Sequence, residues 1–249
     1  MRVAVAGGTG LAGRVVCQAL EDSGHSTIVL ARATGVDLRT GAGLADQLSG
    51  VDAVIDCTNV QTTRARVSEA GFGAMARTLT TASADAHVGH YLALSIVGID
   101  RVGLGYYKGK VVQEDVIRAS SVPWTILRAT QFHEFTTQLL QARGPVVPVP
   151  KMRSATVAIR DVATQFVTLL ASGPATSVVE MRGPEVHAMG SLVRRVAKAT
   201  GDKRPILDLG VPGSVGKAMS GDGLLPQGEA VVGSETFDEW LTRYTAERP

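Results

Sequence analysis

The stretch that decides the fold is Ala6-Gly7-Gly8-Thr9-Gly10-Leu11-Ala12-Gly13, which follows a short apolar run and precedes an amphipathic segment at 14–20. This order predicts a strand, a tight glycine turn and the start of a helix. Gly7, Gly10 and Gly13 have the spacing that lets a backbone turn sharply, approach a pyrophosphate and pack its helix on the strand. The first N–H groups of such a helix have no intrahelical partners and favour phosphate. The motif therefore predicts a dinucleotide site; the alternative is a glycine-rich turn with no ligand.

Composition narrows the class of protein. The 249 residues carry 25 basic and 23 acidic side chains, interspersed along the chain, for a net charge of +2. Such a balance provides no strong field for nucleic acid or an anionic membrane, so neither is expected as a partner. No apolar run approaches the roughly 20 residues that span a bilayer, and the chain enters a strand where a signal would place a charged leader. We expect a cytoplasmic protein, either a monomer or a homodimer.

Neither cysteines nor histidines indicate a metal site. Cys17 and Cys57 have no CxxC or Cys/His spacing and are interpreted as small buried hydrophobes. The five histidines show no ligand spacing such as HExxH. We therefore expect no metal.

Short apolar runs alternate with helix-length segments through the first half of the chain. The runs are typical of parallel strands covered on both faces, and their alternation with helices predicts an α/β fold, a doubly wound parallel sheet of the Rossmann type. The expected strands are 2–6, 26–31, 35–38, 52–58, 91–96 and 124–129, and the expected helices are 43–48, 67–86 and 106–119.

Beyond residue 130 this rhythm changes. Residues 1–130 are expected to form the nucleotide-binding domain, and residues 131–249 a small α/β substrate lobe partly packed back on the Rossmann sheet. A Pro/Val segment at 144–150 is followed by an expected strand at 155–159, a helix at 161–171, a strand at 178–182 and a helix at 189–200. The Gly- and Pro-rich stretch 210–233 predicts a mobile loop or a short helix at the rim.

Polar residues after the second strand bear on the choice of cofactor. Arg32 stands roughly where an acidic residue would accept a hydrogen bond from the ribose of NAD, whereas a guanidinium suits the 2′-phosphate of NADP. NADP(H) is thus favoured over NAD(H); the alternative is a solvated surface arginine. Asp37 is expected either to accept from the adenine amino group or to pair with Arg32 or Arg39.

The fourth expected strand ends in Thr58 and Asn59. These two side chains are candidates to touch the ribose and the nicotinamide, because ligands of open α/β sheets bind at the carboxyl ends of the strands. The alternative is an Asx turn that caps the loop.

Tyr106 and Lys110 lie four residues apart at the start of an expected helix, one turn from each other. An ammonium there favours the phenolate and lowers the pKa of the tyrosine toward the range of a proton donor to a carbonyl oxygen. Lys110 is also a candidate to bind the ribose hydroxyls. Gly109 between them fits a helix approached closely by a ligand or another backbone. The alternative is an exposed aromatic and a solvated lysine.

Two further groups complete the candidate site. Ser95 ends the fifth strand, where its hydroxyl is expected to donate to the same substrate oxygen, or else to cap a loop. Gln131, Phe132 and His133 follow the sixth strand and are candidates to line the substrate pocket.

These residues together resemble the NmrA-like, atypical branch of the short-chain dehydrogenase/reductase superfamily. The likeness lies in GGTGLAGR, Ser95, the segment YYKGK and above all TILRATQFHEF at 125–135. The resemblance implies a Rossmann domain with a small C-terminal lobe, a preference for NADP(H), and Tyr106 and Lys110 near the nicotinamide. It also implies a set of residues around the cofactor: Gly7, Thr9, Gly10, Leu11, Arg32, Asp37, Leu38 and Asn59.

The branch contains both reductases and proteins that bind NADP without turnover. Because the tyrosine and the lysine are both present, we expect an NADPH-dependent oxidoreductase that acts on a small carbonyl or quinone-like molecule. The main alternative is a non-catalytic NADP(H)-responsive regulator. A third, an epimerase or dehydratase that keeps NAD bound, is disfavoured by Arg32.

Overall fold

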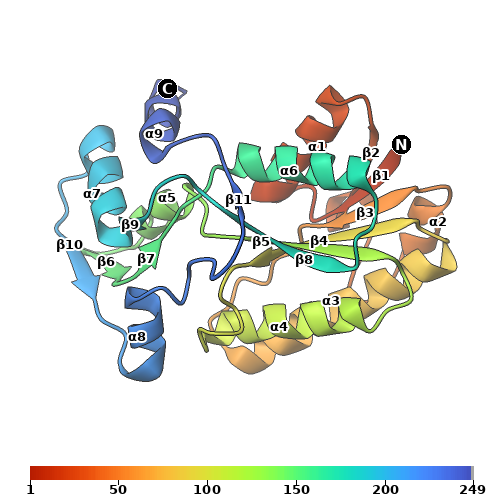
Figure 1. The fold of residues 1–249 in the computed structure, drawn as a ribbon, viewed down its shortest axis with the longest axis horizontal. Coiled ribbons are helices and arrows are strands. Elements are labelled where there is room, and N and C mark those ends of the chain that lie inside the picture. The colour runs from red at the N-terminus through yellow and green to blue at the C-terminus, as the bar shows by residue number, and fades with distance from the viewer. Residues whose placement is uncertain (248–249) are drawn as a thin grey trace.

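The computed structural model describes residues 1–247. A seven-stranded parallel sheet forms the centre of the molecule (Figure 1). Its strands are β1 Arg2–Ala6, β2 Ser26–Leu30, β3 Ala53–Asp56, β4 His90–Ile96, β5 Trp124–Ala129, β8 Ser177–Arg182 and β11 Val231–Val232. They lie in the order β11-β8-β5-β4-β3-β1-β2, and every pairing is parallel. The doubly wound sheet predicted from the apolar runs is confirmed.

Helices cover both faces of the sheet (Figure 1). One face carries α1 Leu11–Asp22 and α6 Ile159–Ser172, and the other carries α2 Leu44–Leu48, α3 Ala65–Asp85 and α4 Gly105–Arg118. Each face has its own apolar core, one built around Val16, Leu20 and Phe166 and the other around Leu48 and Leu79. Burial on both faces explains why β1 and β3 are apolar along almost their whole length.

Gly109 lets α3 and α4 approach closely. A Cβ atom at this position would lie 2.2 Å from Ser68 Oγ and 2.7 Å from Phe72 Cδ2, too close for any side chain. The hydroxyl of Ser68 crosses the interface and donates to the carbonyl of Tyr106 at 2.9 Å. The sequence left open whether a ligand or another backbone approaches Gly109. In the structure it is helix α3 that approaches.

The C-terminal part forms a smaller lobe beside the sheet and also returns to it (Figure 1). The lobe consists of α5 Phe135–Leu140, β6 Val147–Pro150, β7 Arg153–Ser154, β9 His187–Ala188, α7 Met189–Thr200, β10 Ile206–Leu209, α8 Gly213–Ser220 and α9 Phe237–Ala246. Within it, β6 pairs with β10 in parallel and β7 with β9 antiparallel. The segments that return are α6, which packs on α1, and the strands β8 and β11.

Two expected strands are wrong. Residues 35–38 form only an isolated bridge between Asp37 and Ala42, because the 3₁₀ turn Arg32–Thr34 and the left-handed Gly35 turn the chain away after β2. Residues 155–159 make one bridge, from Val157 to Phe132, and helix α6 already begins at Ile159. The stretch 210–233 contains the short helix α8 and, in addition, the edge strand β11.

The chain reverses its direction across the sheet between β1 and β3. From β1 it runs outward to β2, and then returns past β1 to β3 and onward to β4. In open α/β sheets a ligand crevice forms outside the carboxyl ends of the strands at such a reversal. The glycine-rich loop after β1 and the residues after β3 stand on the two sides of this point.

Candidate nucleotide-binding site

The glycine-rich loop folds tightly against its own helix. Gly7 has a left-handed φ of +74°, and its carbonyl accepts the N–H of Gly10 at 2.9 Å. A Cβ atom on Gly13 would lie 2.2 Å from the carbonyl oxygen of Gly7, so only glycine allows the first turn of α1 to sit against the loop. The spacing of Gly7, Gly10 and Gly13 thus produces the expected strand–turn–helix geometry.

The N-terminus of α1 fits a phosphate. Gly10 is its N-cap, no side chain caps the helix, and the first turn holds no acidic residue. Thr9, Gly10 and Leu11 are exposed. The first N–H groups of the helix and the positive end of its dipole are therefore available to an anion, which agrees with a pyrophosphate bound at this turn.

Arg32 directly follows β2 and is exposed. Within residues 1–247 its guanidinium makes no hydrogen bond or ion pair, so it is available to a phosphate. Asp37 does not pair with Arg32 or Arg39 through their side chains; its Oδ1 accepts the backbone N–H of Arg39 at 2.8 Å. Leu38 is buried and belongs to the core beneath the loop.

On the other side of the reversal, Thr58 and Asn59 follow β3. Thr58 is buried and donates its backbone N–H to Asp56 Oδ1 at 2.9 Å, as in an Asx turn. Asn59 is exposed, and its Oδ1 accepts the hydroxyl hydrogen of Tyr106 at 2.8 Å. The structure thus brings the Tyr106 hydroxyl close to the carboxyl end of β3, where the sequence predicted the ligand site.

Lys110 is buried, with 3% of its surface exposed. Its Nζ donates to the carbonyl of Leu94 and to Oε1 of Gln113, both at 2.8 Å, and lies 4.6 Å from the centroid of the Phe72 ring. Desolvation by burial lowers the pKa of Lys110, and the negative charge of Asp56 opposes that change. The alternative of a solvated lysine is therefore wrong.

The expected effect of Lys110 on Tyr106 is not found. Burial raises the pKa of the Tyr106 phenol, and the neighbouring Tyr107 adds to the increase. The two side chains of the Tyr-x-x-x-Lys pair have different partners, since one reaches Asn59 and the other Leu94 and Gln113. In this structure the phenol is therefore held in its protonated form.

The sequence patterns did not predict a buried polar network around Asp56. The carboxylate of Asp56, fully buried at the end of β3, accepts from Tyr91 Oη at 2.8 Å and from Gln113 Nε2 at 2.7 Å, both through Oδ2. Gln113 continues to Lys110. The signal in the sequence was an aspartate at the end of an otherwise apolar strand, which needs buried partners.

Ser95 has a different partner from the one expected. Its buried hydroxyl donates to Oε1 of Glu114 at 2.5 Å, and this carboxylate also binds Arg128 through two hydrogen bonds of 2.9 and 2.7 Å. The hydrogen that was expected to reach a substrate oxygen is thus already donated within the protein. The structure corrects the interpretation of Ser95 toward a role in holding β4, α4 and β5 together.

Gln131 and Phe132 are half-buried beyond β5, whereas His133 is 1% exposed. The ring of His133 bonds Thr156 Oγ1 at 2.9 Å and the carbonyl of Glu235 at 3.3 Å, and burial lowers its pKa to about 4. The expectation that His133 lines a substrate pocket is corrected, because its buried ring bonds Thr156 and the segment that leads into α9.

Gln131 connects two parts of the site. Its Nε2 donates to Tyr107 Oη at 3.1 Å, and its Oε1 accepts from Ser154 Oγ at 2.5 Å. Tyr107 precedes Gly109 on α4, and Ser154 belongs to β7. Gln131 therefore lies where α4 meets the lobe.

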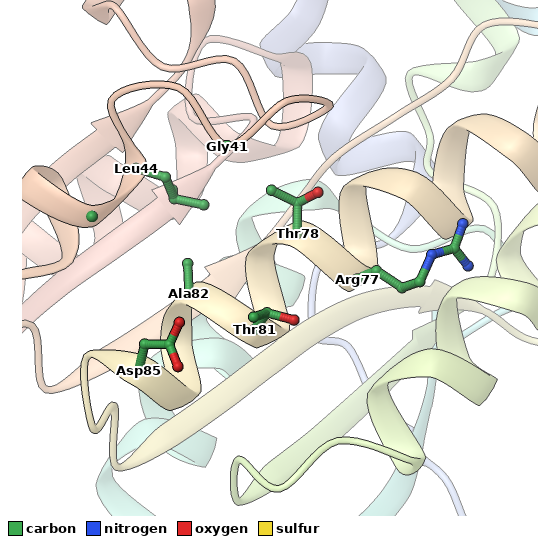
Figure 2. A pocket seen from close by; sticks show the side chains of 8 residues that line it. Gly41, Leu44, Arg77, Thr78, Thr81, Ala82 and Asp85 are labelled. Atoms are coloured by element: carbon green, nitrogen blue, oxygen red, sulfur yellow. The ribbon is translucent and has the colours of Figure 1, made fainter.

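A hollow of about 330 Å³ lies elsewhere, between the loop before α2 and the outer side of α3 (Figure 2). In Figure 2 the Arg77 side chain points away from Asp85, so their charges do not converge on one point. None of the predicted site residues lines this hollow; its walls are Gly41, Leu44, Ala45, Arg77, Thr78, Thr81, Ala82 and Asp85.

The described residues set two further bounds. Within residues 1–247 no group of three or more His, Cys, Asp or Glu side chains is arranged to hold a metal ion. No helix in this part of the chain is both long and apolar enough to cross a bilayer.

Comparison with known families agrees with this geometry. The model of the NAD(P)H-binding family matches residues 7–172, from the glycine-rich loop to the end of α6. The chain belongs to the NAD(P)H-binding family. A search of curated protein sequences gave no match.

Solved structures with the same fold are short-chain dehydrogenase/reductase proteins and related enzymes. A superfamily member from Agrobacterium tumefaciens with bound NAD is 17% identical, with a TM-score of 0.70 over 99% of this chain and 96% of that one. The NADPH-dependent quinone oxidoreductase QOR2 of Escherichia coli is 18% identical, with a TM-score of 0.71 over 97% and 99%. A UDP-N-acetylglucosamine 4-epimerase from Bacillus cereus is 17% identical, with a TM-score of 0.66 over 84% and 87%. At these identities the likeness establishes the fold alone.

Proposed function

We propose that this protein is an NADPH-dependent reductase of the NmrA-like type, which reduces a small carbonyl or quinone-like substrate. The observation that carries the proposal is the hydrogen bond from Tyr106 to Asn59, because it puts a phenol at the end of β3, across the reversal point from the glycine-rich loop. A phenol beside the crevice in which a dinucleotide would lie supports its proposed role as proton donor.

The residues of the chain suit NADP(H) as the cofactor. The first turn of α1 and the loop at Gly7–Gly10 would hold the pyrophosphate, and the unpaired Arg32 the 2′-phosphate. When bound, the cofactor supplies a hydride, which the substrate carbon accepts. The reduced oxygen then requires a proton from the protein.

Tyr106 is the proposed source of that proton. Its half-buried phenol is protonated at neutral pH, and its Oη would donate to the substrate oxygen once it leaves Asn59. The ammonium of Lys110, one helical turn along, is the charge proposed to stabilise the resulting phenolate. Gln131 and Phe132, on the side of the lobe, are proposed to contact the substrate.

A second candidate is a non-catalytic, NADP(H)-responsive regulator. Three observations favour it: Lys110 is engaged inside the protein, the hydroxyl of Ser95 is donated to Glu114, and burial raises the pKa of Tyr106. These features do not interfere with nucleotide binding, and the raised pKa makes Tyr106 a weaker proton donor.

One experiment separates the two functions. NADPH binding is followed by the fluorescence of Trp124 and Trp240, and NADPH oxidation by absorbance with a panel of aldehydes, ketones and quinones. A reductase oxidises NADPH with at least one compound, and Tyr106→Phe loses that activity while still binding NADPH. Binding without oxidation across the panel supports the regulator. If NADPH does not bind even at millimolar concentration, both proposals fail.

A further inference from the structure

We propose that Gln113 and Asp56 are positioning residues that hold the Lys110 ammonium in place with one N–H free for the bound nucleotide. The inference rests on the proposed function for the identity of the ligand. The arrangement of the three side chains is independent of it.

Gln113 joins a buried carboxylate to a buried ammonium. Its Nε2 donates to Asp56 Oδ2 at 2.7 Å, and its Oε1 accepts from Lys110 Nζ at 2.8 Å. The amide can satisfy both neighbours in only one orientation, with nitrogen toward the carboxylate and oxygen toward the ammonium. Gln113 is 1% exposed and Asp56 is fully buried, so water does not replace either bond.

The carboxylate at the far end of this bridge is itself fixed. Asp56 Oδ2 also accepts from Tyr91 Oη at 2.8 Å, and Oδ1 accepts from the backbone N–H of Thr58 at 2.9 Å. Three donors thus stabilise its negative charge inside the protein. The two ionic groups form no direct ion pair within residues 1–247, so Gln113 is the hydrogen-bonded link between them, and the charge of Asp56 acts on Lys110 through space.

Only the charged form of Lys110 has enough N–H donors to bind both of its protein acceptors and a ligand. An ammonium has three N–H groups, and two of them reach the carbonyl of Leu94 and Oε1 of Gln113. No third acceptor for Nζ lies within the described chain, although the Phe72 ring is 4.6 Å away. The third N–H can therefore serve a ribose hydroxyl, whereas a neutral amine in the same place would have none to spare.

Groups from several elements set the balance at Lys110. Burial opposes the charged form, while Asp56 at the end of β3 and Glu114 on α4 favour it. Gln113, on α4, hydrogen-bonds both Lys110 and Asp56. Changing Gln113 should therefore alter the pH range in which Lys110 is charged while the glycine-rich loop stays intact.

Two substitutions at this position have opposite expected effects. Gln113→Leu removes the bridge, so NADPH binding should weaken about tenfold at mildly alkaline pH, and the pH midpoint of binding should fall by about one unit. Gln113→Glu replaces the N–H donated to Asp56 by an oxygen, so the two carboxyl groups share a proton and part of the negative charge moves next to Lys110. The midpoint should therefore rise. Asp56→Asn should act like Gln113→Leu. A purely structural role would weaken binding at every pH without moving the midpoint.

The matched control is Gln18→Leu. Gln18 also donates Nε2 to an aspartate, Asp22 at 2.8 Å, but it lies on the exposed side of α1. Its substitution should leave the midpoint where it is in the wild-type protein. Calorimetric titrations with NADPH from about pH 6 to about pH 10 measure all four variants, a range that brackets a lysine with lowered pKa.

A second readout needs no nucleotide. The chain has six lysines, so ¹³C-labelled lysine gives few NMR signals, and Lys110→Met assigns the one from Lys110. The midpoint of that signal should fall in Asp56→Asn and rise in Gln113→Glu. Unchanged midpoints in both variants would overturn the inference, even if Gln113→Leu does not fold. If NADPH fails to bind the wild-type protein but these shifts occur, the proposed function is wrong and the positioning of Lys110 stands.

Discussion

The hydroxyl of Ser95 donates its hydrogen to Oε1 of Glu114 over 2.5 Å. This bond joins the end of β4 to α4, and the carboxylate continues to Arg128 on β5 and to Arg118, which binds Oε2 at 2.6 Å. A serine at the end of a strand beside a Tyr-x-x-x-Lys segment suggests a catalytic donor. Its geometry instead ties three elements of the Rossmann domain together.

Ser95→Ala should therefore cost stability and leave function intact. Losing a buried hydrogen bond to a charged group is expected to lower the free energy of unfolding by about 2 kcal/mol. NADPH affinity, and turnover if the protein is a reductase, should change by less than about threefold, or ~0.7 kcal/mol. Urea unfolding and NADPH titration provide the two measurements.

Ser83→Ala is the control for this experiment, since Ser83 is buried on α3 and donates to the carbonyl of Leu79 at 2.7 Å. It should also lose stability without losing binding. A large loss of turnover in Ser95→Ala alone, with full NADPH binding, would restore the catalytic interpretation.

Gly13→Ala tests the tight turn of the dinucleotide loop. The added Cβ would lie 2.2 Å from the carbonyl oxygen of Gly7, so either the loop or the first turn of α1 must move. We expect a stability loss of about 1–3 kcal/mol and a large loss of NADPH affinity, seen by thermal unfolding and calorimetry. Gly210→Ala is the control, because nothing lies within 4 Å of its Cβ position. Unchanged NADPH affinity in Gly13→Ala would contradict this account of the loop.

Arg32→Ser tests the choice between the two coenzymes. The exposed guanidinium after β2 has no partner within residues 1–247, so its removal should not destabilise the fold. NADPH should bind at least about tenfold more weakly, a loss of ~1.4 kcal/mol, while NADH binding stays the same. Arg143→Ser, at an exposed arginine in the loop after α5, should change neither affinity. Equal weakening of both coenzymes would show that Arg32 does not contact the 2′-phosphate.

The sequence was most informative where local chemistry decides the structure. The glycine spacing fixes the loop after β1, because Gly7 needs a left-handed backbone and Gly13 needs a missing Cβ. The apolar runs at β3 and β5 identify buried parallel strands, because burial on both faces leaves few polar positions. These features require no knowledge of distant partners.

The sequence did not predict contacts between residues that lie far apart along the chain. Nothing local to Asp56 says that Gln113, 57 residues away, will donate to it, and nothing near His133 shows that Glu235 will accept from its ring. The segment at 35–38 has the composition of a strand, but it finds no neighbouring strand to pair with. The direction of the Lys110 side chain likewise depends on two acceptors, Gln113 on the same helix and Leu94 on β4. The four-residue spacing between Tyr106 and Lys110 does not specify either of them.

Two buried histidines should make the fold sensitive to acid. Burial lowers the pKa of His90 to about 4, and His133 has a pKa of about 4 for the same reason. Within residues 1–247, Nδ1 of His90 has no hydrogen-bond partner, so a proton added there would remain unpaired. Because both histidines bind protons more readily when unfolded, their contribution to stability is complete above the unfolded pKa of about 6.5 and is lost as the pH falls toward 4.

Urea unfolding at a series of pH values measures this effect. Between about pH 6.5 and about pH 4, each histidine should lower the free energy of unfolding by up to about 1.4 kcal/mol per pH unit. His90→Gln keeps a hydrogen-bond donor near Thr125 but cannot titrate, so the loss of unfolding free energy per pH unit should decrease by the contribution of one histidine. His87→Asn, on the exposed turn before β4, should leave that loss unchanged. If His90→Gln retains the full wild-type slope, proton uptake by buried His90 is not what destabilises the protein in acid.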